Sequence, residues 1–240
     1  MREIVSVENL TKKIRKNVLF ENLCFNISSG EVVGLLGHNG AGKSTIHKII
    51  ANRENADSGN VRIAGEDKSF ETYNPNVILI PDKIMMIPNI SIVDNFELLT
   101  KNYNVDRTFF EKYIGVINLE LDRVINSLSK GNQELVQIII LLSINVDLYL
   151  LDEPFSGVDI FRRDLIQKII IDVSLRNPNA AMIMTSHLIN EIEKTLTRVL
   201  YLDQGHIVIN KNIEDITEEH QSLFEYLKDF FGESVGYNNV

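Results

Sequence analysis

The segment GHNGAGKST, residues 37–45, constrains the fold more than any other part of this chain. It follows a buried strand predicted at 31–36 and runs into a helix that begins near Lys43. This order of strand, glycine-rich loop and helix is the setting of a phosphate-binding loop, because glycines leave the backbone N–H groups free to point at a phosphate. Lys43 would bind the β- and γ-phosphates, Ser44 would ligate Mg²⁺, and the helix N-terminus adds its positive end. We expect phosphate contacts from Gly37, His38, Asn39, Gly40, Ala41, Gly42, Lys43, Ser44 and Thr45.

The segment LYLLDEP, residues 148–154, contains two adjacent acids near its end. Its apolar residues predict a buried strand whose carboxyl end presents Asp152 and Glu153 together. Asp152 would hold Mg²⁺ or one of its waters, and Glu153 would orient or deprotonate an attacking water. Such a pair often only caps a helix, but beside a phosphate-binding loop it supplies the second half of a nucleotide site.

The rest of the pattern predicts an α/β fold. Residues 4–28 read as two strands around a basic turn, and short strands follow at 58–66 and 76–81. Helical periodicity covers 85–145. Beyond it we expect strands at 148–152, 181–186 and 198–203, with helices over 160–173 and 189–196. The fold class is therefore a P-loop NTPase core of mixed sheet with helices, an N-terminal antiparallel β region and an inserted α-helical subdomain.

We expect a single domain over 1–240. Its parts are a RecA-like core (1–84 and 146–212), a helical subdomain (85–145) and a C-terminal helical tail (213–240). In the tail, helical spacing favours packing against the body rather than against a partner. The residues with this spacing are Leu223, Phe224, Leu227, Phe230 and Phe231.

Three further segments are motif candidates: LSKGN at 128–132, SGVD at 156–159 and MTSH at 184–187. Together with loop 37–45 and LYLLDEP they give five motifs in a fixed order along the chain. From residue 4 to about 210 this order resembles the ATP-binding subunits of ABC transporters. The resemblance implies that Ser129 and Gly131, at a helix N-terminus, cap the γ-phosphate of ATP bound to the opposite subunit. It also implies that Asp159 reaches across the dimer and that His187 senses the γ-phosphate. Glu153, His187 and Lys43 are then the expected catalytic residues.

The chain departs from the family pattern at several positions. Lys130 and Asn132 differ from the usual LSGGQ signature, and Val158 replaces a leucine. Ile14 aligns with an aromatic residue that often stacks on adenine. Asp82, in IPDK, stands where the family has a glutamine that links Mg²⁺ to the membrane partner, and we expect its carboxylate to be a third metal ligand besides Ser44 and Asp152.

The resemblance implies ATP and Mg²⁺ as cofactors and ATP hydrolysis coupled to transport. It implies a homodimer or heterodimer of ATPase subunits and a separate membrane-spanning subunit. The contact with that subunit would involve helix 91–102 and PDKIMMIP, where Met85 and Met86 suit an adaptable surface. The same residues equally fit ordinary core packing. LSKGNQ and IPDK favour bacterial exporters of peptides, lipids or antibiotics.

Two other functions fit parts of the pattern. A soluble ABC-type ATPase, such as those of iron-sulfur cluster assembly, shares the same site residues, so only its co-purifying partner would distinguish it. A P-loop GTPase needs an Asn-Lys-x-Asp motif, but NKNI at 210–213 ends in Ile213. A small-molecule kinase needs an acceptor pocket that the sequence does not reveal.

Composition narrows the location and the partners. A net charge of −9 argues against nucleic acid held by a broad basic face. Cys24 is the only cysteine, which excludes an internal disulfide and fits a reducing compartment. The N-terminus lacks a signal-peptide core, and no apolar run approaches the roughly 18 residues that cross a bilayer. We expect a cytoplasmic protein held at the inner face of the cell membrane through its partner.

Overall fold

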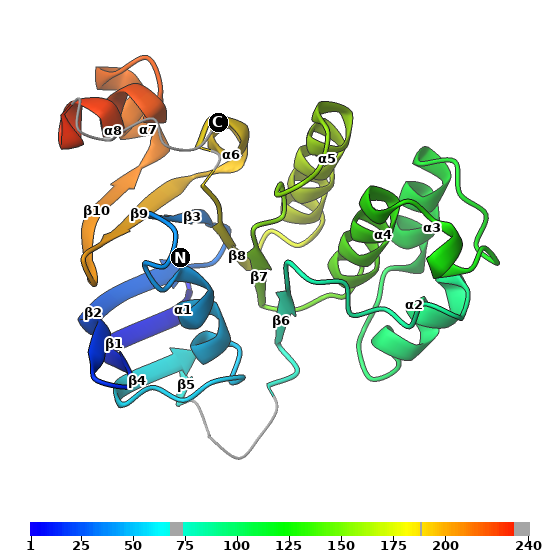
Figure 1. The fold of residues 1–240 in the computed structure, drawn as a ribbon, viewed down its shortest axis with the longest axis horizontal. Helices are drawn as coiled ribbons and strands as arrows, with labels where there is room; N and C mark the ends of the chain where they lie inside the picture. The colour runs from blue at the N-terminus through cyan, green and yellow to red at the C-terminus, as the bar shows by residue number, and fades with distance from the viewer. Residues whose placement is uncertain (68–73, 188, 233–240) are drawn as a thin grey trace.

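The computed structural model describes residues 1–67, 74–187 and 189–232, and its strands form two sheets (Figure 1). The first sheet is antiparallel, in the order β2-β1-β4-β5. Its strands are β1 (Glu3–Ile14), β2 (Asn17–Ser28), β4 (Ser58–Ile63) and β5 (Glu66–Asp67). This sheet is the antiparallel region expected from the alternation in the first 28 residues.

The second sheet has six strands in the order β10-β9-β3-β8-β7-β6. They are β3 (Val32–Leu36), β6 (Val77–Ile80), β7 (Leu148–Asp152), β8 (Ala181–Thr185), β9 (Arg198–Asp203) and β10 (His206–Asn212). Only β10 runs antiparallel to its neighbour; the other five strands are parallel. The carboxyl ends of β3, β7 and β8 therefore meet at one edge, which is where open α/β sheets bind ligands.

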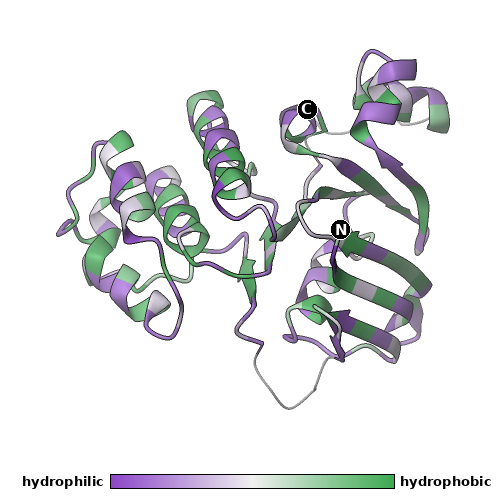
Figure 2. Ribbon diagram, turned by 180° about the vertical axis from the view of Figure 1, so that it is seen from behind, coloured by the Kyte–Doolittle hydropathy of each residue, from purple (hydrophilic) through white to green (hydrophobic). Residues whose placement is uncertain are grey.

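The six-stranded sheet separates two hydrophobic clusters. Along β7, Tyr149 and Leu151 pack with the helical part of the chain, whereas Leu148 and Leu150 pack with the antiparallel sheet and helix α1 (Lys43–Ile50). Side chains alternate between the two faces of a strand, so a strand buried on both faces reads as a continuous apolar run. In Figure 2 the short parallel strands are mostly green, whereas the helices and the strands of the antiparallel sheet carry both green and purple.

Three helices gather at one end of the molecule in Figure 1: α2 (Ile92–Thr100), α3 (Arg107–Val116) and α4 (Lys130–Leu142). Each begins at a polar cap. The side chains of Ser91, Asp106 and Ser129 accept hydrogen bonds from backbone N–H groups of the first turn. Inside this group the rings of Phe96 and Phe110 stack with centroids 4.0 Å apart. Polar caps and apolar faces thus fix helices where the periodicity predicted them.

The predicted fold class is confirmed, but some boundaries were wrong. Helix α5 (Ile160–Arg176) is longer than the expected 160–173. The helix expected over 189–196 is only a short α6 (Ile189–Ile192) followed by a 3-10 turn (Glu193–Thr195). Strand β10 was not expected at all. The division into core, helical subdomain and tail remains our proposal.

The tail contains two helices, α7 (Ile213–Glu219) and α8 (Leu223–Phe231), within its described part. Leu223 and Leu227 are buried and Phe231 packs against the core, whereas Phe230 is 50% exposed. The tail therefore packs on the body through most of the residues that the helical spacing indicated.

Candidate functional site

The glycine-rich loop adopts a backbone that its glycines make possible. Gly37 and Gly42 have φ of 147° and 107°, in the region that side chains disfavour. A Cβ on Gly37 would lie 2.3 Å from the carbonyl oxygen of Leu202, so the loop packs directly against β9. Helix α1 then begins at Lys43. The strand, loop and helix expected from the sequence are all present.

Lys43 folds back over the loop. Its Nζ donates hydrogen bonds to the carbonyl oxygens of Gly37 (2.7 Å) and His38 (3.1 Å), and the residue is buried. Burial lowers the pKa of its ammonium group, while the nearby carboxylates of Glu153 and Asp152 act in the opposite direction. A cation is thus held against the loop with two acids close by.

Asp152 joins three elements at the sheet edge. Its Oδ1 accepts hydrogen bonds from Ser44 Oγ on α1 and from Thr185 Oγ1 at the end of β8, each at 2.8 Å. A hydroxyl and a carboxylate are hard oxygen donors, which suit Mg²⁺. The described residues contain no cluster of three or more His, Cys, Asp or Glu able to hold a metal by themselves. This donor set fits Mg²⁺ bound together with substrate phosphates, since Mg²⁺ seldom uses an all-protein cage.

Glu153 and His187 face each other at the same edge. His187 Nδ1 lies 2.8 Å from Glu153 Oε2, and both side chains are partly exposed. Glu153 has φ of 52°, an uncommon value for a residue other than glycine. Its backbone N–H donates to Thr185 Oγ1 at 3.0 Å, which holds this conformation in place. The acid and the histidine predicted from separate motifs are direct neighbours.

Asp82 shares a small cavity with the acids of β7. The cavity, of about 30 Å³, is also lined by Glu134, Gln137, Asp152 and Glu153. Asp82 is exposed, in the segment that follows β6. Its position beside Asp152 is compatible with the expected metal role, which remains a proposal.

The remaining predicted residues form a second cluster at the N-termini of α4 and α5. Ser129 caps α4, and Asp159 caps α5 through the N–H groups of Phe161 and Arg162. These backbone bonds, with that of Arg162 the largest cause, lower the pKa of Asp159. Arg162 links the two helix starts, because it pairs with Asp159 and donates from Nη2 to Asn132 Oδ1 at 3.0 Å.

The two clusters are separate within one subunit. Helices α4 and α1 lie apart in Figure 1, and in the described residues no hydrogen bond or ion pair joins Ser129, Gly131 or Asp159 to loop 37–45. Gly131 instead lies against the guanidinium of Arg162. The chain thus brings together the loop, Asp152, Glu153 and His187, but not the signature residues.

Two contributors were missed by sequence reasoning. Thr185 binds both Asp152 and the N–H of Glu153, and its signal was a hydroxyl at the end of a buried strand. Arg162 connects the signature to Asp159 without any motif of its own. The two methionines of PDKIMMIP differ: Met86 is buried in the core, as the alternative interpretation of this segment has it, whereas Met85 is 43% exposed.

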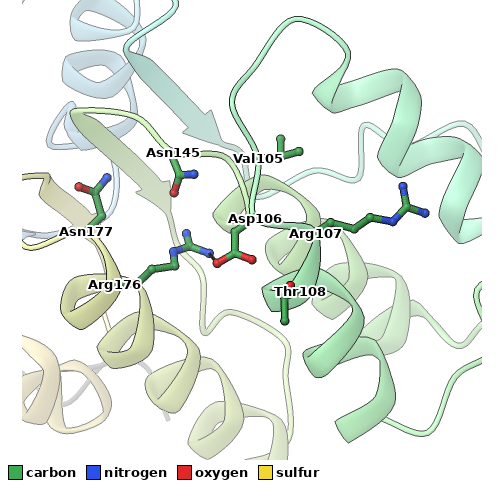
Figure 3. A pocket seen from close by; sticks show the side chains of 7 residues that line it. All are labelled: Val105, Asp106, Arg107, Thr108, Asn145, Arg176 and Asn177. Atoms are coloured by element: carbon green, nitrogen blue, oxygen red, sulfur yellow. Dashed lines mark hydrogen bonds and ion pairs between the residues drawn. The ribbon is translucent and has the colours of Figure 1, made fainter.

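A second hollow, of about 530 Å³, lies between α3 and α5 (Figure 3). Arg176 and Asp106 meet across it, while the side chain of Arg107 points away. None of the predicted site residues lines it. Separately, none of the helices in the described ranges is both long and apolar enough to cross a bilayer.

Comparisons of this chain with known proteins all indicate the same family. A family model described as ABC transporter matches residues 20–156, more than half of the chain. An uncharacterized ABC transporter ATP-binding protein of Methanocaldococcus jannaschii is 31% identical over 234 residues, covering 95% of this chain and 84% of its own length. The lipopolysaccharide export system ATP-binding protein LptB of Haemophilus influenzae is 28% identical over 242 residues, covering 95% and 98%.

A solved structure shows the same fold. It is a dimeric structure of a post-hydrolysis state of an ATP-binding cassette bound to ADP and Pi. It matches with a TM-score of 0.75 at 23% identity, covering 88% of this chain and 99% of that one. The chain therefore belongs to the ABC transporter family, as an ATPase subunit of the kind that its motif order predicted.

Proposed function

We propose that this chain binds ATP with Mg²⁺ at loop 37–45 and hydrolyses it with Glu153 and His187, within a dimer that drives a separate membrane-spanning exporter. One observation supports this most strongly: Asp152 Oδ1 accepts from both Ser44 and Thr185. That shared atom fixes the helix after the phosphate loop, the strand before Glu153 and the strand before His187 in one site.

In this proposal Lys43 and the loop N–H groups bind the β- and γ-phosphates. Ser44 and Asp152 hold Mg²⁺, with Asp82 at the edge of the same cavity. When bound, the ion supplies charge neutralisation at the transferred phosphoryl group. All of these groups lie on the carboxyl edge of the parallel strands.

Hydrolysis needs a base beside the γ-phosphate, and we assign that role to Glu153. An Nδ1–H tautomer of His187 would donate to the Glu153 carboxylate and so hold both side chains in one arrangement. The hydroxyl of Thr185 keeps the backbone of Glu153 in its uncommon conformation. The strain is thus located at the residue proposed to activate water.

The second cluster, with Ser129, Gly131 and Asp159 at the N-termini of α4 and α5, is separate from loop 37–45, and this separation supports a dimer. In a two-fold pair, Ser129, Gly131 and Asp159 of one copy can face the loop of the other and the reverse. The dimeric form of the solved relative is consistent with this arrangement. Either two copies of this chain or this chain with a homologous subunit would complete both sites.

Export of a lipid, peptide or antibiotic is the transport direction that we propose. The name of the Haemophilus influenzae relative and the LSKGNQ and IPDK segments support it. We place the chain in the cytoplasm, held at the inner face of the membrane by its partner, with exposed Met85 in the contact. The soluble alternative in iron-sulfur cluster assembly is not favoured, because both relatives are named as transporter ATP-binding proteins.

Glu153→Gln tests the assignment. It keeps the size and most contacts of the side chain but removes the base. We expect ATP·Mg²⁺ affinity by calorimetry to change by less than about 2-fold, while phosphate release falls by about 100-fold or more. Glu120→Gln, in an exposed position, is the matched control and should hydrolyse ATP normally. Hydrolysis retained in Glu153→Gln would remove Glu153 from this role.

A further inference from the structure

We infer that Gln137 is a positioning residue that makes segment 81–85 and helix α4 move as one body, and so couples the nucleotide site of one subunit to its own signature residue Ser129. The inference rests on the proposed function. It concerns how two parts of that site are held together, which none of the sequence motifs specifies.

Gln137 is buried, with 3% of its surface exposed, and both polar atoms of its amide are hydrogen-bonded. Its Oε1 accepts from the backbone N–H of Met85 at 2.6 Å. Its Nε2 donates to the carbonyl oxygens of Pro81 at 3.3 Å and Lys83 at 3.1 Å. One side chain therefore holds three backbone groups of a five-residue segment that has no regular secondary structure.

The segment held by Gln137 leads directly to the nucleotide site. It follows β6, which pairs along its whole length with β7, and β7 ends at Asp152. Asp82 lies within it, and Gln137 lines the same cavity as Asp82, Asp152 and Glu153. A shift of this segment would change the position of Asp82 relative to the acids of β7.

The other end of the connection is the start of α4. Gln137 and Ser129 belong to the same helix unit, since Ser129 caps the helix that runs from Lys130 to Leu142. In a helix of this length, any displacement of one turn is passed on to the next turn, because each backbone hydrogen bond joins residues four positions apart. Movement of segment 81–85 would therefore carry Ser129 with it.

A buried polar side chain can also be only structural, and Asn95 provides the comparison. Asn95 is fully buried, and it also makes three backbone bonds: Nδ2 donates to Ile87 and Ser91, and Oδ1 accepts from Ile87. All its partners precede or begin its own helix α2. Asn95 holds the residues between segment 81–85 and helix α2 but makes no bond to α4 among the described residues, so it is a matched control.

The test compares Gln137→Met with Asn95→Leu in the full chain. Each replaces a buried amide by an apolar side chain of similar size, and each removes three hydrogen bonds. For Gln137→Met we expect kcat for ATP hydrolysis to fall about 10-fold, because groups at the reaction centre lose their alignment. The Kd for ATP·Mg²⁺ should change by less than about 2-fold, since loop 37–45, with Ser44, and Asp152 stay in place and supply most of the contacts to ATP·Mg²⁺, with exposed Asp82 adding little to affinity. Asn95→Leu should change kcat by less than about 2-fold.

Equal losses of kcat in the two variants would contradict the inference, as would an unchanged kcat in Gln137→Met. Gln137→Asn, which keeps the amide but is one carbon shorter, covers the case in which the methionine variant does not fold. Its kcat should also fall with Kd unchanged, and an unchanged kcat would equally contradict the inference. Failure of the proposed function would be seen separately, as hydrolysis that Glu153→Gln does not remove.

Discussion

His47 is completely buried on α1, three residues after Ser44. Within residues 1–67, 74–187 and 189–232, neither of its ring nitrogens has a hydrogen-bond partner. Desolvation lowers its pKa to about 4, although Asp152 acts in the opposite direction. The ring is therefore buried in its neutral form. Burying an N–H group without a partner costs about 1–3 kcal/mol, so this position destabilises the fold.

We predict that His47→Leu raises the free energy of unfolding at pH 7 by about 1–2 kcal/mol. The pH dependence should change as well. The unfolded histidine takes up a proton near pH 6.5 but the folded one only near 4, so wild-type stability is full above 6.5 and falls as the pH drops toward 4. The variant should lack this part of the loss. Urea titrations at pH 7 and 5 would measure both effects.

His206→Leu is the control for that experiment, because His206 is exposed on β10. It should leave the stability at pH 7 nearly unchanged. A lower stability of His47→Leu at pH 7 would show that the buried ring makes an interaction that outweighs its desolvation.

The sequence allowed some site residues to be predicted and not others. Lys43, Ser44 and Asp152 belong to short motifs whose spacing reports a local backbone shape, and the structure places them together. Gln137 and Thr185 act through partners more than 30 positions away in the chain. No local pattern contains such a contact, because it depends on which strands and helices become neighbours.

Arg176 joins three helices at the hollow shown in Figure 3. From the end of α5 its Nη2 donates to the carbonyl oxygen of Leu142, the last residue of α4, at 2.6 Å. Its Nη1 lies 3.5 Å from the carboxylate of Asp106, the cap of α3. The guanidinium carbon is 4.2 Å from the ring centroid of Phe109 on α3. The planar cation thus fixes the packing of α5 on the helical group.

We predict that Arg176→Met lowers the free energy of unfolding by about 2–3 kcal/mol, because a charged hydrogen bond to a carbonyl oxygen and a cation–π contact are lost. Chemical denaturation would measure the loss. Arg15→Met, at an exposed turn, should cost less than about 0.5 kcal/mol. Equal stability of the Arg176 variant and wild type would mean that helix packing alone holds α5 in place.

The wrong boundaries have separate physical causes. Helix α5 ends at Arg176 because Asn177 precedes Pro178, and proline disfavours a helical residue before it. That signal was available in the sequence. Among the described strands β10 lies at an edge and pairs only with β9, and most of its residues are exposed. Its pattern was too polar to indicate a strand, so its pairing depended on the finished sheet.

The two clusters described above imply that one copy of the chain lacks a complete site. Ser129 caps α4, which lies with α2 and α3 at one end of the molecule in Figure 1, whereas Lys43 begins α1 and contacts its own loop. In the dimer that we propose, two-fold symmetry would give each loop the signature of the other copy. A complete site would then contain Lys43 of one chain and Ser129 of its partner, and mixing of variants tests this proposal.

Lys43→Ala removes the phosphate cation and should hydrolyse ATP poorly. Ser129→Asp keeps a good helix cap but places a carboxylate where the γ-phosphate would lie, so it should also be nearly inactive. In a mixture of equal amounts, random pairing makes half of the dimers mixed, and each mixed dimer has one intact site of two. We therefore expect about a quarter of wild-type phosphate release, if the sites act independently.

Ser222→Asp, the same change at the cap of α8, controls for the added charge at a helix start and should leave hydrolysis intact. Recovery in the mixture cannot come from either chain alone, because neither contains both an intact loop and an intact signature. If the two residues served the same subunit's nucleotide, or if the active pair required a different homologous chain, mixing would restore nothing. The measured fraction thus reports directly on whether Lys43 and Ser129 of different copies share one nucleotide.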